Sequence, residues 1–562
     1  MVADYVGLKQ ANCKDCYRCI RNCPVQAISY TDHQARILDE DCVVCGRCFV
    51  ACPQNAKEIR DDVPKARKLL AGGAPVWASL APSFVARYEN IGLAGVRDAL
   101  KKLGFAGVQE TALGAAVVKK RYDEMIMAEE QDIIISSCCH SVTMLLQKHF
   151  PAALPCLAPV LSPMQAHCQA IKLAEPGAKT VFIGPCISKK AEADAYPGLV
   201  DCVLTFEELS AWFKSEGISP ESDTSAEDAE EAGKTRLFPA TGGILKSMDC
   251  ANEAYAYLSV DGVENCIQAV KDILAGSLGK CFIEMSICAG SCIGGPAMDL
   301  EHRLSLRANM AVNASAGRED FTVVTPPATA LVKDMGRGTR TRYVVAENDI
   351  RDVLRKTGKT RPEHELNCGS CGYPTCRDKA RAVVLGKADL AMCLPYLKEK
   401  AESFSDAIIT HTPNAILVLD EGLHVQQVND SARRLFGAMG AADIPGASVS
   451  RFMDPDIFLE ARDRGATIYD RPAYFADHGK YVEQTVIHDP NFHIFVAIIR
   501  DVTEAETARR ERDAMRSQTI AVADDVVAKQ MRVVQEIASL LGETTAETKI
   551  ALTRLKGSLN ND

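Results

Sequence analysis

The sequence predicts a multidomain protein that combines α/β and α+β regions. At 562 residues the chain is too long for one hydrophobic core. Between about residues 75 and 345, short apolar runs such as "KTVFIGPC" alternate with helix-like stretches such as "VRDALKKLGF", which is an α/β pattern. Cysteine groups flank this region, whereas residues 401–503 contain no cysteine. These shifts in composition mark the predicted domain boundaries.

Composition and charge are those of a mildly acidic globular protein. Hydrophobic residues make up 47% of the chain, charged residues 25%, and the formal net charge is -10. This balance gives no electrostatic reason to expect nucleic acid as a partner. No apolar run approaches the roughly 20 residues of a membrane span, and the first residues lack the apolar core of a signal peptide. We therefore expect a cytoplasmic protein without a membrane partner, in which 23 cysteines indicate metal binding rather than disulfides.

The first 60 residues contain an internal cysteine repeat. "CKDCYRCIRNCP" and "CVVCGRCFVACP" both read C-x2-C-x2-C-x3-C-P. Three cysteines at two-residue gaps can hold one face of a [4Fe-4S] cube, while the fourth ligates the other cube. The expected ligand sets are Cys13, Cys16, Cys19 and Cys52 for one cube, and Cys42, Cys45, Cys48 and Cys23 for the second. Residues 1–62 thus resemble a bacterial two-cluster ferredoxin, and two zinc sites are the disfavoured alternative.

Four separated elements in the central region carry a second signal. They are "SSCCHS" at 136–141, "GPCISKKAEA" at 184–193, "FPATGGI" at 238–244 and "CAGSC" at 288–292. In this order they resemble the H-domain of [FeFe]-hydrogenases, and we assign residues 63–350 to it. Glycines after the last element would let the backbone approach a bulky inorganic group.

The resemblance implies a complete H-cluster. In that family four thiolates bind a [4Fe-4S] cube, and the last of them bridges to a two-iron subcluster with CO, cyanide and a dithiolate bridge. The matching residues are Cys139, Cys186, Cys288 and the bridging Cys292. The remaining cysteines of the region match no ligand position and are expected in the core: Cys156, Cys168, Cys202, Cys250, Cys266 and Cys281.

Candidate catalytic residues also follow from the resemblance. Lys189 matches a lysine that donates a charge-assisted hydrogen bond to cyanide. Cys138 matches the thiol that passes protons to the dithiolate amine. Glu192 and Ser286 complete the candidate catalytic set. Without the resemblance, such a lysine is usually a solvated helix residue and such a cysteine a small buried hydrophobe.

The sequence departs from the family pattern around this site. Gly184 and Ser286 stand where fast enzymes of the family have methionines, so we expect a smaller and more polar wall. The run that usually bears two proton-relay glutamates reads "TALGAAVVKKRYDEM", in which Glu124 is the candidate substitute. Such changes alter potential and proton delivery without abolishing the cluster. They predict a slow or biased hydrogenase.

A third cysteine group follows the central region. Its spacing is C-x2-C-x4-C-x16-C, formed by Cys368, Cys371, Cys376 and Cys393. The group resembles a small [4Fe-4S] module of redox enzymes and sensors, assigned to residues 360–399, and structural zinc is the alternative. A relay or a redox switch would suit its position between the catalytic region and the tail.

Residues 400–503 resemble a PAS domain. The matched features are the Pro413-Asn414 entry, the helix from Asn429 to Phe436 and the closing Asp501-Val502-Thr503. Absence of cysteine excludes a flavin–thiol photosensor, and the stretch "DPDIFLEARDRGATIY" has no histidine for heme. The ligand stays open, and a sensing role and a purely structural role remain alternatives.

The tail, residues 504–562, is predicted to be helical. Ile520, Val527, Val534 and Leu541 recur every seven residues, which favours a parallel coiled coil and a homodimer. Gly542 resembles a helix stop, and Thr544 with Glu547 makes a capping box that would begin a second helix. The tail is therefore expected to form a helical hairpin.

Together these features predict a ferredoxin-type [FeFe]-hydrogenase that interconverts H2 with protons and electrons. The expected cofactors are four [4Fe-4S] clusters and the two-iron subcluster. The expected partners are a ferredoxin-like electron carrier, maturation proteins for the two-iron unit and a downstream signalling protein. Two alternatives remain open: an H2 or redox sensor with negligible metabolic turnover, and an iron–sulfur electron carrier that lacks the two-iron unit.

Overall fold

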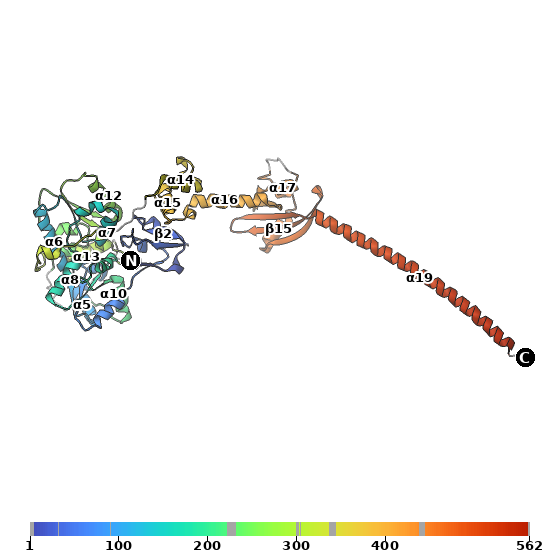
Figure 1. The fold of residues 1–562 in the computed structure, drawn as a ribbon, viewed down its shortest axis with the longest axis horizontal. Helices are drawn as coiled ribbons and strands as arrows, with labels where there is room; N and C mark the ends of the chain where they lie inside the picture. The colour runs from blue at the N-terminus through green and yellow to red at the C-terminus, as the bar shows by residue number, and fades with distance from the viewer. Residues whose placement is uncertain are drawn as a thin grey trace. The chain divides into compact units, whose positions relative to one another are not determined.

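The structure is a computed structural model that describes residues 5–31, 33–89, 91–221, 232–298, 303, 305–336, 344–437 and 444–559. Two compact units make up the chain, residues 1–397 and residues 398–562 (Figure 1). The polar, acidic stretch at 215–236 is predicted from its composition to be an exposed loop, and its residues 222–231 lie outside the described residues.

The cysteine repeat forms a small two-fold arrangement of hairpins and short helices. β1 (Val6–Leu8) pairs antiparallel with β4 (Lys57–Ile59), and β2 (Ile28–Thr31) pairs antiparallel with β3 (Gln34–Ile37). Each cysteine motif runs into one short helix, α1 (Arg18–Arg21) or α2 (Arg47–Ala51). Tyr17 and Gly46, which precede these helices, are both left-handed, with φ of 53° and 72°. A side chain at Gly46 would lie 2.5 Å from Pro296, so only glycine allows this close approach to the central region.

The central region contains two parallel sheets, as the α/β pattern predicts. The first has the order β6-β5-β8-β9 and the second the order β10-β11-β7. Their strands are β5 (Val76–Leu80), β6 (Gly107–Glu110), β7 (Ile133–Ile135), β8 (Lys179–Gly184), β9 (Cys202–Thr205), β10 (Ala256–Asp261) and β11 (Cys281–Ser286). Because parallel strands carry helices on both faces, these strands read as nearly continuous apolar runs. Ligand sites of such sheets lie at the carboxyl ends of the strands.

The helices of the central region connect and cover these sheets (Figure 1). They are α3 (Val63–Leu70), α4 (Phe84–Arg87), α5 (Gly92–Lys102), α6 (Ala112–Met127), α7 (His140–His149), α8 (Pro163–Ala174), α9 (Ser188–Ala195), α10 (Phe206–Ser215), α11 (Gly243–Ser247), α12 (Val263–Leu274) and α13 (Leu306–Ser315). Ser162 and Thr205 form capping boxes at the start of α8 and α10, which satisfies backbone N–H groups there.

The third cysteine group packs against the N-terminal repeat. It lies with α14 (Glu347–Lys356) and α15 (Cys376–Val384), and α16 (Leu394–His411) begins directly after Cys393. Ile20 and Tyr30 of the repeat share one apolar cluster with Tyr373. The Arg21 guanidinium donates to the Ser370 carbonyl at 3.1 Å. The two cysteine regions, which lie more than 300 residues apart in sequence, therefore form one packed body.

The second unit contains a five-stranded antiparallel sheet of order β13-β12-β16-β15-β14. The strands are β12 (Ala415–Asp420), β13 (Val425–Val428), β14 (Ile468–Phe475), β15 (Lys480–Asp489) and β16 (Ile494–Asp501). Helices α17 (Asp430–Leu435) and α18 (Asp456–Arg464) share its apolar core, which alternates along the strands as expected for a half-buried sheet. The predicted helix at Asn429 begins as expected, because the Asn429 side chain accepts from the Ala432 amide.

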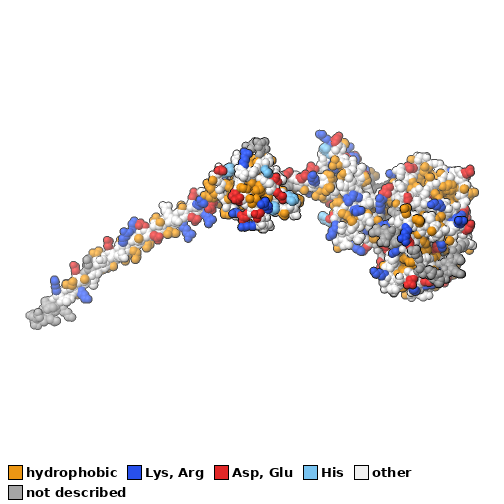
Figure 2. Space-filling view, turned by 180° about the vertical axis from the view of Figure 1, so that it is seen from behind, with side chains coloured by type: hydrophobic (Ala, Val, Ile, Leu, Met, Phe, Trp, Pro, Cys, Tyr) orange, Lys and Arg blue, Asp and Glu red, His pale blue; other side chains and the backbone are white. Residues whose placement is uncertain are grey.

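The predicted hairpin in the tail is wrong. Residues Thr503–Leu559 form one continuous helix, α19, and Gly542 lies inside it. A glycine within a helix costs only about 1 kcal/mol relative to alanine, and the uninterrupted backbone hydrogen bonds of a long helix outweigh that cost. Figure 2 shows hydrophobic side chains along α19, and Ile520, Val527 and Val534 are all more than half exposed.

Among the described residues, no helix combines the length and the apolar character that crossing a membrane would require.

Candidate functional site

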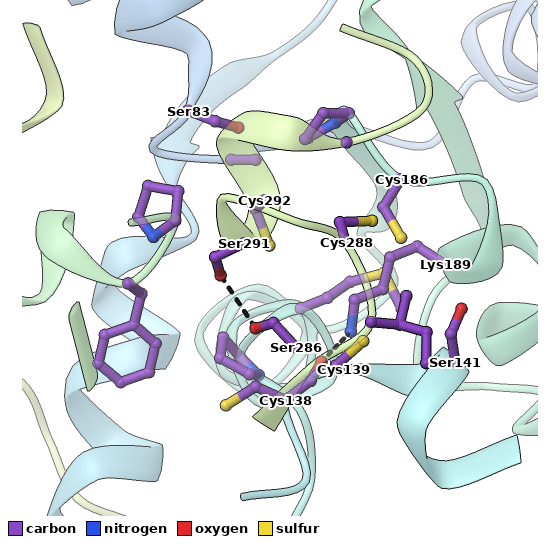
Figure 3. A pocket seen from close by; sticks show the side chains of 18 of the residues that line it. Ser83, Cys138, Cys139, Ser141, Cys186, Lys189, Ser286, Cys288, Ser291 and Cys292 are labelled. Atoms are coloured by element: carbon purple, nitrogen blue, oxygen red, sulfur yellow. Dashed lines mark hydrogen bonds between the residues drawn. The ribbon is translucent and has the colours of Figure 1, made fainter. Parts of the chain in front are cut away.

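A cavity of about 110 Å³ lies where segments that follow strands of both parallel sheets come together. Cys138 and Cys139 follow β7, Cys186 follows β8, and Cys288 follows β11. The structure brings the four predicted H-cluster ligands together here, since all of them line this cavity (Figure 3): Cys139, Cys186, Cys288 and Cys292. The cavity therefore joins three chain segments that the sequence separates by about 150 residues.

The four thiols influence one another electrostatically. Burial raises the pKa of Cys139 and of Cys288, and the neighbouring Cys186 sulfur raises both further. Burial raises the pKa of Cys292 in the same way, although Cys292 keeps accessible surface where it lines the cavity. Several thiolates in one buried cavity repel one another unless a cation lies between them. The donor set therefore fits an iron cluster, which binds thiolates and supplies the missing positive charge.

The Cys138 side chain has other partners than the four predicted ligand thiols. The Tyr122 hydroxyl lies 3.4 Å from the Cys138 sulfur and 3.0 Å from Ser137 Oγ, and it accepts from the Ser137 amide at 2.9 Å. Burial raises the pKa of Cys138 to about 12, and the Tyr122 hydrogen bond opposes this shift. Cys138 thus lies at the cavity wall as a thiol with its own hydrogen-bond partner.

Lys189 enters the cavity wall from α9. Its ammonium donates to the Cys138 carbonyl at 2.9 Å and lies 2.6 Å from Glu192 Oε2. Burial lowers the pKa of Lys189, but the Glu192 carboxylate and the Cys186 sulfur outweigh it, so the pKa lies above its ordinary value. Glu192 is fully buried, and it also contacts the ammonium of Lys333. Lys189 and Glu192 therefore lie next to the ligand set, on one turn of α9.

Ser286 lies at the end of β11 and lines the cavity. Its hydroxyl forms a 2.9 Å hydrogen bond with the Ser291 hydroxyl. Ser291 is part of the turn between Cys288 and Cys292 and has φ of 55°, which is uncommon outside glycine. Ser286 therefore holds the turn that presents two of the four thiols.

The N-terminal cysteines form two separate groups. Cys13, Cys16, Cys19 and Cys52 line one small cavity. In the second set, burial raises the pKa of Cys23 and of Cys48, and both are raised further by Cys42 and Cys45. Each group contains three cysteines of one motif and the last cysteine of the other, which is the arrangement that the spacing predicts. Cys45 also lines the cavity that contains Cys139, Cys186, Cys288 and Cys292.

The third cysteine group also surrounds one small cavity, lined by Cys368, Cys371, Cys376 and Cys393. The buried Lys359 ammonium donates to the Cys393 sulfur at 3.4 Å and to the Thr357 carbonyl at 3.0 Å. Burial raises the pKa of Cys371. A buried ammonium beside a thiolate favours the charged sulfur that metal binding requires.

Comparison with protein-family models agrees with this geometry. Residues 74–296 match the model "Iron only hydrogenase large subunit, C-terminal domain". This match covers both parallel sheets of the central region and the turn that carries Cys288 and Cys292. Residues 12–66 match the "4Fe-4S dicluster domain", residues 365–395 match an Fe-S cluster model, and residues 403–471 match the "PAS domain". The chain thus combines a region similar to an iron-only hydrogenase domain with iron–sulfur cluster regions and a PAS region.

Known relatives are distant. Iron hydrogenase 1 of Clostridium pasteurianum is 23% identical, over 48% of this chain and 66% of that protein. One component of an ion-translocating oxidoreductase complex from Methanosarcina acetivorans is 39% identical, over 10% of this chain and 22% of that protein. The chain therefore spans just under two thirds of the first relative and about a fifth of the second. A solved apo [FeFe]-hydrogenase from Chlamydomonas reinhardtii is 19% identical over 47% of this chain and 91% of that chain, with a TM-score of 0.36.

Within the hydrogenase domain, the expected departures take a specific form. The Phe182 ring lines the cavity and lies beside Gly184, where a Cβ atom would be 2.8 Å from it. The wall at this position is therefore aromatic, whereas a more polar wall was expected from Gly184. Glu124, the candidate relay residue, is exposed on α6 and pairs with Arg121. It does not line the cavity.

Two residues near the site were not predicted from the sequence. Tyr122 lies in the run where relay glutamates were expected, but its hydroxyl reaches Cys138 only through the packing of α6 against the segment after β7. Glu284 is a buried acid within the apolar run "CFIEM", which was a signal in the sequence. Burial raises its pKa to about 7, although the amides of Gly242, Ile244 and Leu245 donate to its carboxylate.

The cysteines outside the ligand sets are only partly core residues. Four of them are buried, as expected: Cys168, Cys202, Cys266 and Cys281. Cys156 and Cys250 are only half-buried, so the core assignment is wrong for these two. Cys250 lies 3.9 Å from the Tyr257 hydroxyl near the surface of the domain.

Proposed function

We propose that the protein is an [FeFe]-hydrogenase that converts two protons and two electrons reversibly to H2. The observation that carries the proposal is the convergence of Cys139, Cys186, Cys288 and Cys292 on one cavity that also presents Lys189 and Cys138. Bound there, a [4Fe-4S] cube joined to a two-iron unit supplies the redox chemistry of H2. The protein residues hold this group, exclude water and supply protons.

Each residue of the site has a chemical role in the proposal. The four cysteines would hold the cube, and Cys292 would be the ligand nearest the two-iron unit. Lys189 donates a hydrogen bond to an anionic ligand where the protein makes few covalent bonds. Cys138 carries a proton at its sulfur, a role that its neighbour Cys139 cannot fill while it binds metal. Tyr122 orients the Cys138 thiol through their 3.4 Å contact.

The surrounding residues support a slow or biased enzyme. Residues 63–350 are the proposed catalytic domain, and Ser286 and Gly184 replace the methionines expected there. No glutamate in the described part of α6 lines the cavity, so protons reach Cys138 by another route than the usual one. We expect H2 turnover well below that of enzymes with both relay glutamates.

Infrared spectroscopy tests the proposal directly. Anaerobically purified protein, co-produced with maturation proteins or loaded with a synthetic two-iron complex, should show CO and cyanide stretching bands. Chemical analysis should find about sixteen irons in cubes from four groups of four cysteines, in addition to the two-iron unit. Absence of the CO and cyanide bands from protein that holds its iron–sulfur cubes and has been treated in this way would leave only the electron-carrier alternative.

The PAS domain favours a second candidate function, an H2 or redox sensor. In this case residues 1–62 and 360–399 pass electrons, and residues 400–503 with the tail at 504–562 transmit a signal to a downstream protein. Deletion of residues 400–562 separates the two candidates. A metabolic enzyme would keep H2 turnover and growth-linked activity, whereas a sensor would keep turnover but lose the downstream response to H2.

The partners follow from the same proposal. The N-terminal cubes would exchange electrons with a ferredoxin-like carrier in the cytoplasm. Separate maturation proteins would insert the two-iron unit, and α19 would form a homodimer through its apolar residues.

A further inference from the structure

Buried lysines in the first unit have contrasting charge environments. Lys119 and Lys190 are fully buried, and the ammonium of each contacts two carboxylates: Asp249 and Asp320 for Lys119, Asp62 and Glu208 for Lys190. One carboxylate of each pair also contacts a further cation, Lys234 at Asp249 and Arg60 at Asp62, so positive and negative charges are balanced in these groups. A buried ammonium with two partners is the ordinary solution, because it leaves no positive charge uncompensated.

At Glu192 one carboxylate contacts two ammonium groups. Lys189 Nζ lies 2.6 Å from one oxygen of this carboxylate, and the ammonium of Lys333 contacts the other oxygen. The side chains of Glu192 and Lys333 are both fully buried. Two ammonium groups and one carboxylate therefore leave one excess positive charge beside the cavity.

The excess charge is directed at the cavity through Lys189. An ammonium has three N–H donors, and Lys189 uses two of them on the Cys138 carbonyl and on Glu192. Its third donor is free for a bound group, since Lys189 lines the cavity. Lys333 does not line the cavity, and its Nζ instead lies 4.6 Å from the centre of the Tyr196 ring. An isolated buried charge is strongly unfavourable, so this arrangement is suited to an anion in the cavity.

We infer that Lys333 is a positioning residue that occupies Glu192 and thereby leaves Lys189 with a positive charge for an anionic ligand in the cavity. Without Lys333, the Lys189–Glu192 pair would be neutral overall, so the Lys189 ammonium would attract an anionic ligand more weakly. The inference rests on the proposed function, in which the anionic ligand is a cyanide of the two-iron unit.

Uptake of a synthetic two-iron complex tests this inference. The probe carries CO, cyanide and a bridging dithiolate, and it is titrated into the full chain reconstituted with iron and sulfide. Lys333→Met should bind the complex roughly tenfold more weakly than the wild type, because a charge-assisted hydrogen bond becomes a weaker one. The cyanide stretching bands should shift, while Lys333→Arg, which keeps the charge, should restore most of the wild-type uptake.

Thermal melting before addition of the complex distinguishes positioning from a structural role. Removal of an excess buried charge should leave the melting temperature of Lys333→Met equal to or above that of the wild type. The matched control is Lys190→Met, which removes the ammonium contact of the Glu208 carboxylate and leaves Asp62 with Arg60 alone, and which should melt at a lower temperature. A melting temperature of Lys333→Met that falls as far as that of the control would overturn the inference.

The outcomes separate the inference from the proposed function. A wild-type protein that never shows CO and cyanide bands contradicts the proposed function itself. A wild-type protein that takes up the complex, with Lys333→Met taking it up equally well and showing the same cyanide bands, overturns the role of Lys333 alone.

Discussion

The Tyr122 hydroxyl lies 3.4 Å from the Cys138 sulfur, and it also accepts a hydrogen bond from the Ser137 amide at 2.9 Å. Tyr122 belongs to α6, which stands where the family usually carries relay glutamates, and its side chain is fully buried. The residue that contacts the proposed proton carrier is therefore a tyrosine hydroxyl, with a much higher ordinary pKa than a carboxyl group.

The first prediction concerns Tyr122→Phe. Loss of the hydroxyl removes the partner of Cys138 and leaves the Ser137 amide without an acceptor, so stability should fall by about 1–3 kcal/mol. H2 turnover should fall several-fold, with the infrared bands of the loaded site retained. Both are measured on protein loaded with the two-iron unit.

A matched control exists for this variant. The Tyr257 hydroxyl also accepts a backbone amide, from Asn252 at 2.9 Å, and also lies near a cysteine sulfur, that of Cys250. Tyr257→Phe should lose stability without a specific loss of turnover. If both variants lost turnover to the same extent, Tyr122 would have no special link to Cys138.

The second prediction concerns the pH dependence of Glu284. Burial raises the pKa of this acid from 4.5 to about 7. The folded protein therefore holds a proton that the unfolded chain releases, so this group contributes stability that declines as pH rises from about 4.5 to 7. The full change is about 3 kcal/mol, since one pKa unit corresponds to 1.36 kcal/mol.

Glu284→Gln should remove this component of the pH dependence. The melting temperatures are measured from pH 5 to pH 8. As pH rises from 5 to 7, the melting temperature of the variant should decline less steeply than that of the wild type. The exposed Glu124→Gln variant is the control, and it should follow the wild type. Parallel curves for wild type and Glu284→Gln would show that Glu284 does not titrate in this range.

The third prediction concerns the cluster proposed for residues 360–399. The buried Lys359 ammonium lies 3.4 Å from the Cys393 sulfur, so it stabilises the more negative, reduced cluster. Lys359→Met should lower the reduction potential by on the order of 60 mV, which is a tenfold change for one electron. The measurement is a redox titration followed by electron paramagnetic resonance.

Lys356→Met is the control for this variant, because Lys356 is exposed on α14, three residues earlier. It should leave the potential unchanged. Equal potentials for Lys359→Met and the wild type would remove the electrostatic role of Lys359. Iron content of each variant verifies that the cluster is present.

The fourth prediction concerns α19. Val527 and Val534 are 59% and 56% exposed in the single chain and lie one heptad apart, so a partner helix should cover them. Val527→Lys combined with Val534→Lys should convert a dimer to a monomer in light scattering. Ala528→Lys with Gln535→Lys adds the same charge on neighbouring positions and should leave the dimer intact; equal effects would contradict a seam through the valines.

The sequence determined which cysteines could share a cluster. In the N-terminal repeat, the spacing within a few residues already limits which thiols can reach one cube, and the structure groups them accordingly around Cys13 and Cys42. The alternation of apolar strands and helices likewise predicted an α/β core, which the structure builds as two parallel sheets whose carboxyl ends carry Cys139, Cys186 and Cys288.

Only the tertiary structure decided the surroundings of the cavity lined by Cys139, Cys186, Cys288 and Cys292. Tyr122, Glu284 and Lys333 act on it through partners that are remote in sequence, and no local pattern records such contacts. In the tail a local signal gave a wrong prediction. Gly542 is typical of a helix end, but the continuous backbone hydrogen bonds of α19 outweigh its low helix propensity. The spacing of nearby cysteines can be read directly from the sequence, whereas the balance of buried charge depends on which distant segments pack together.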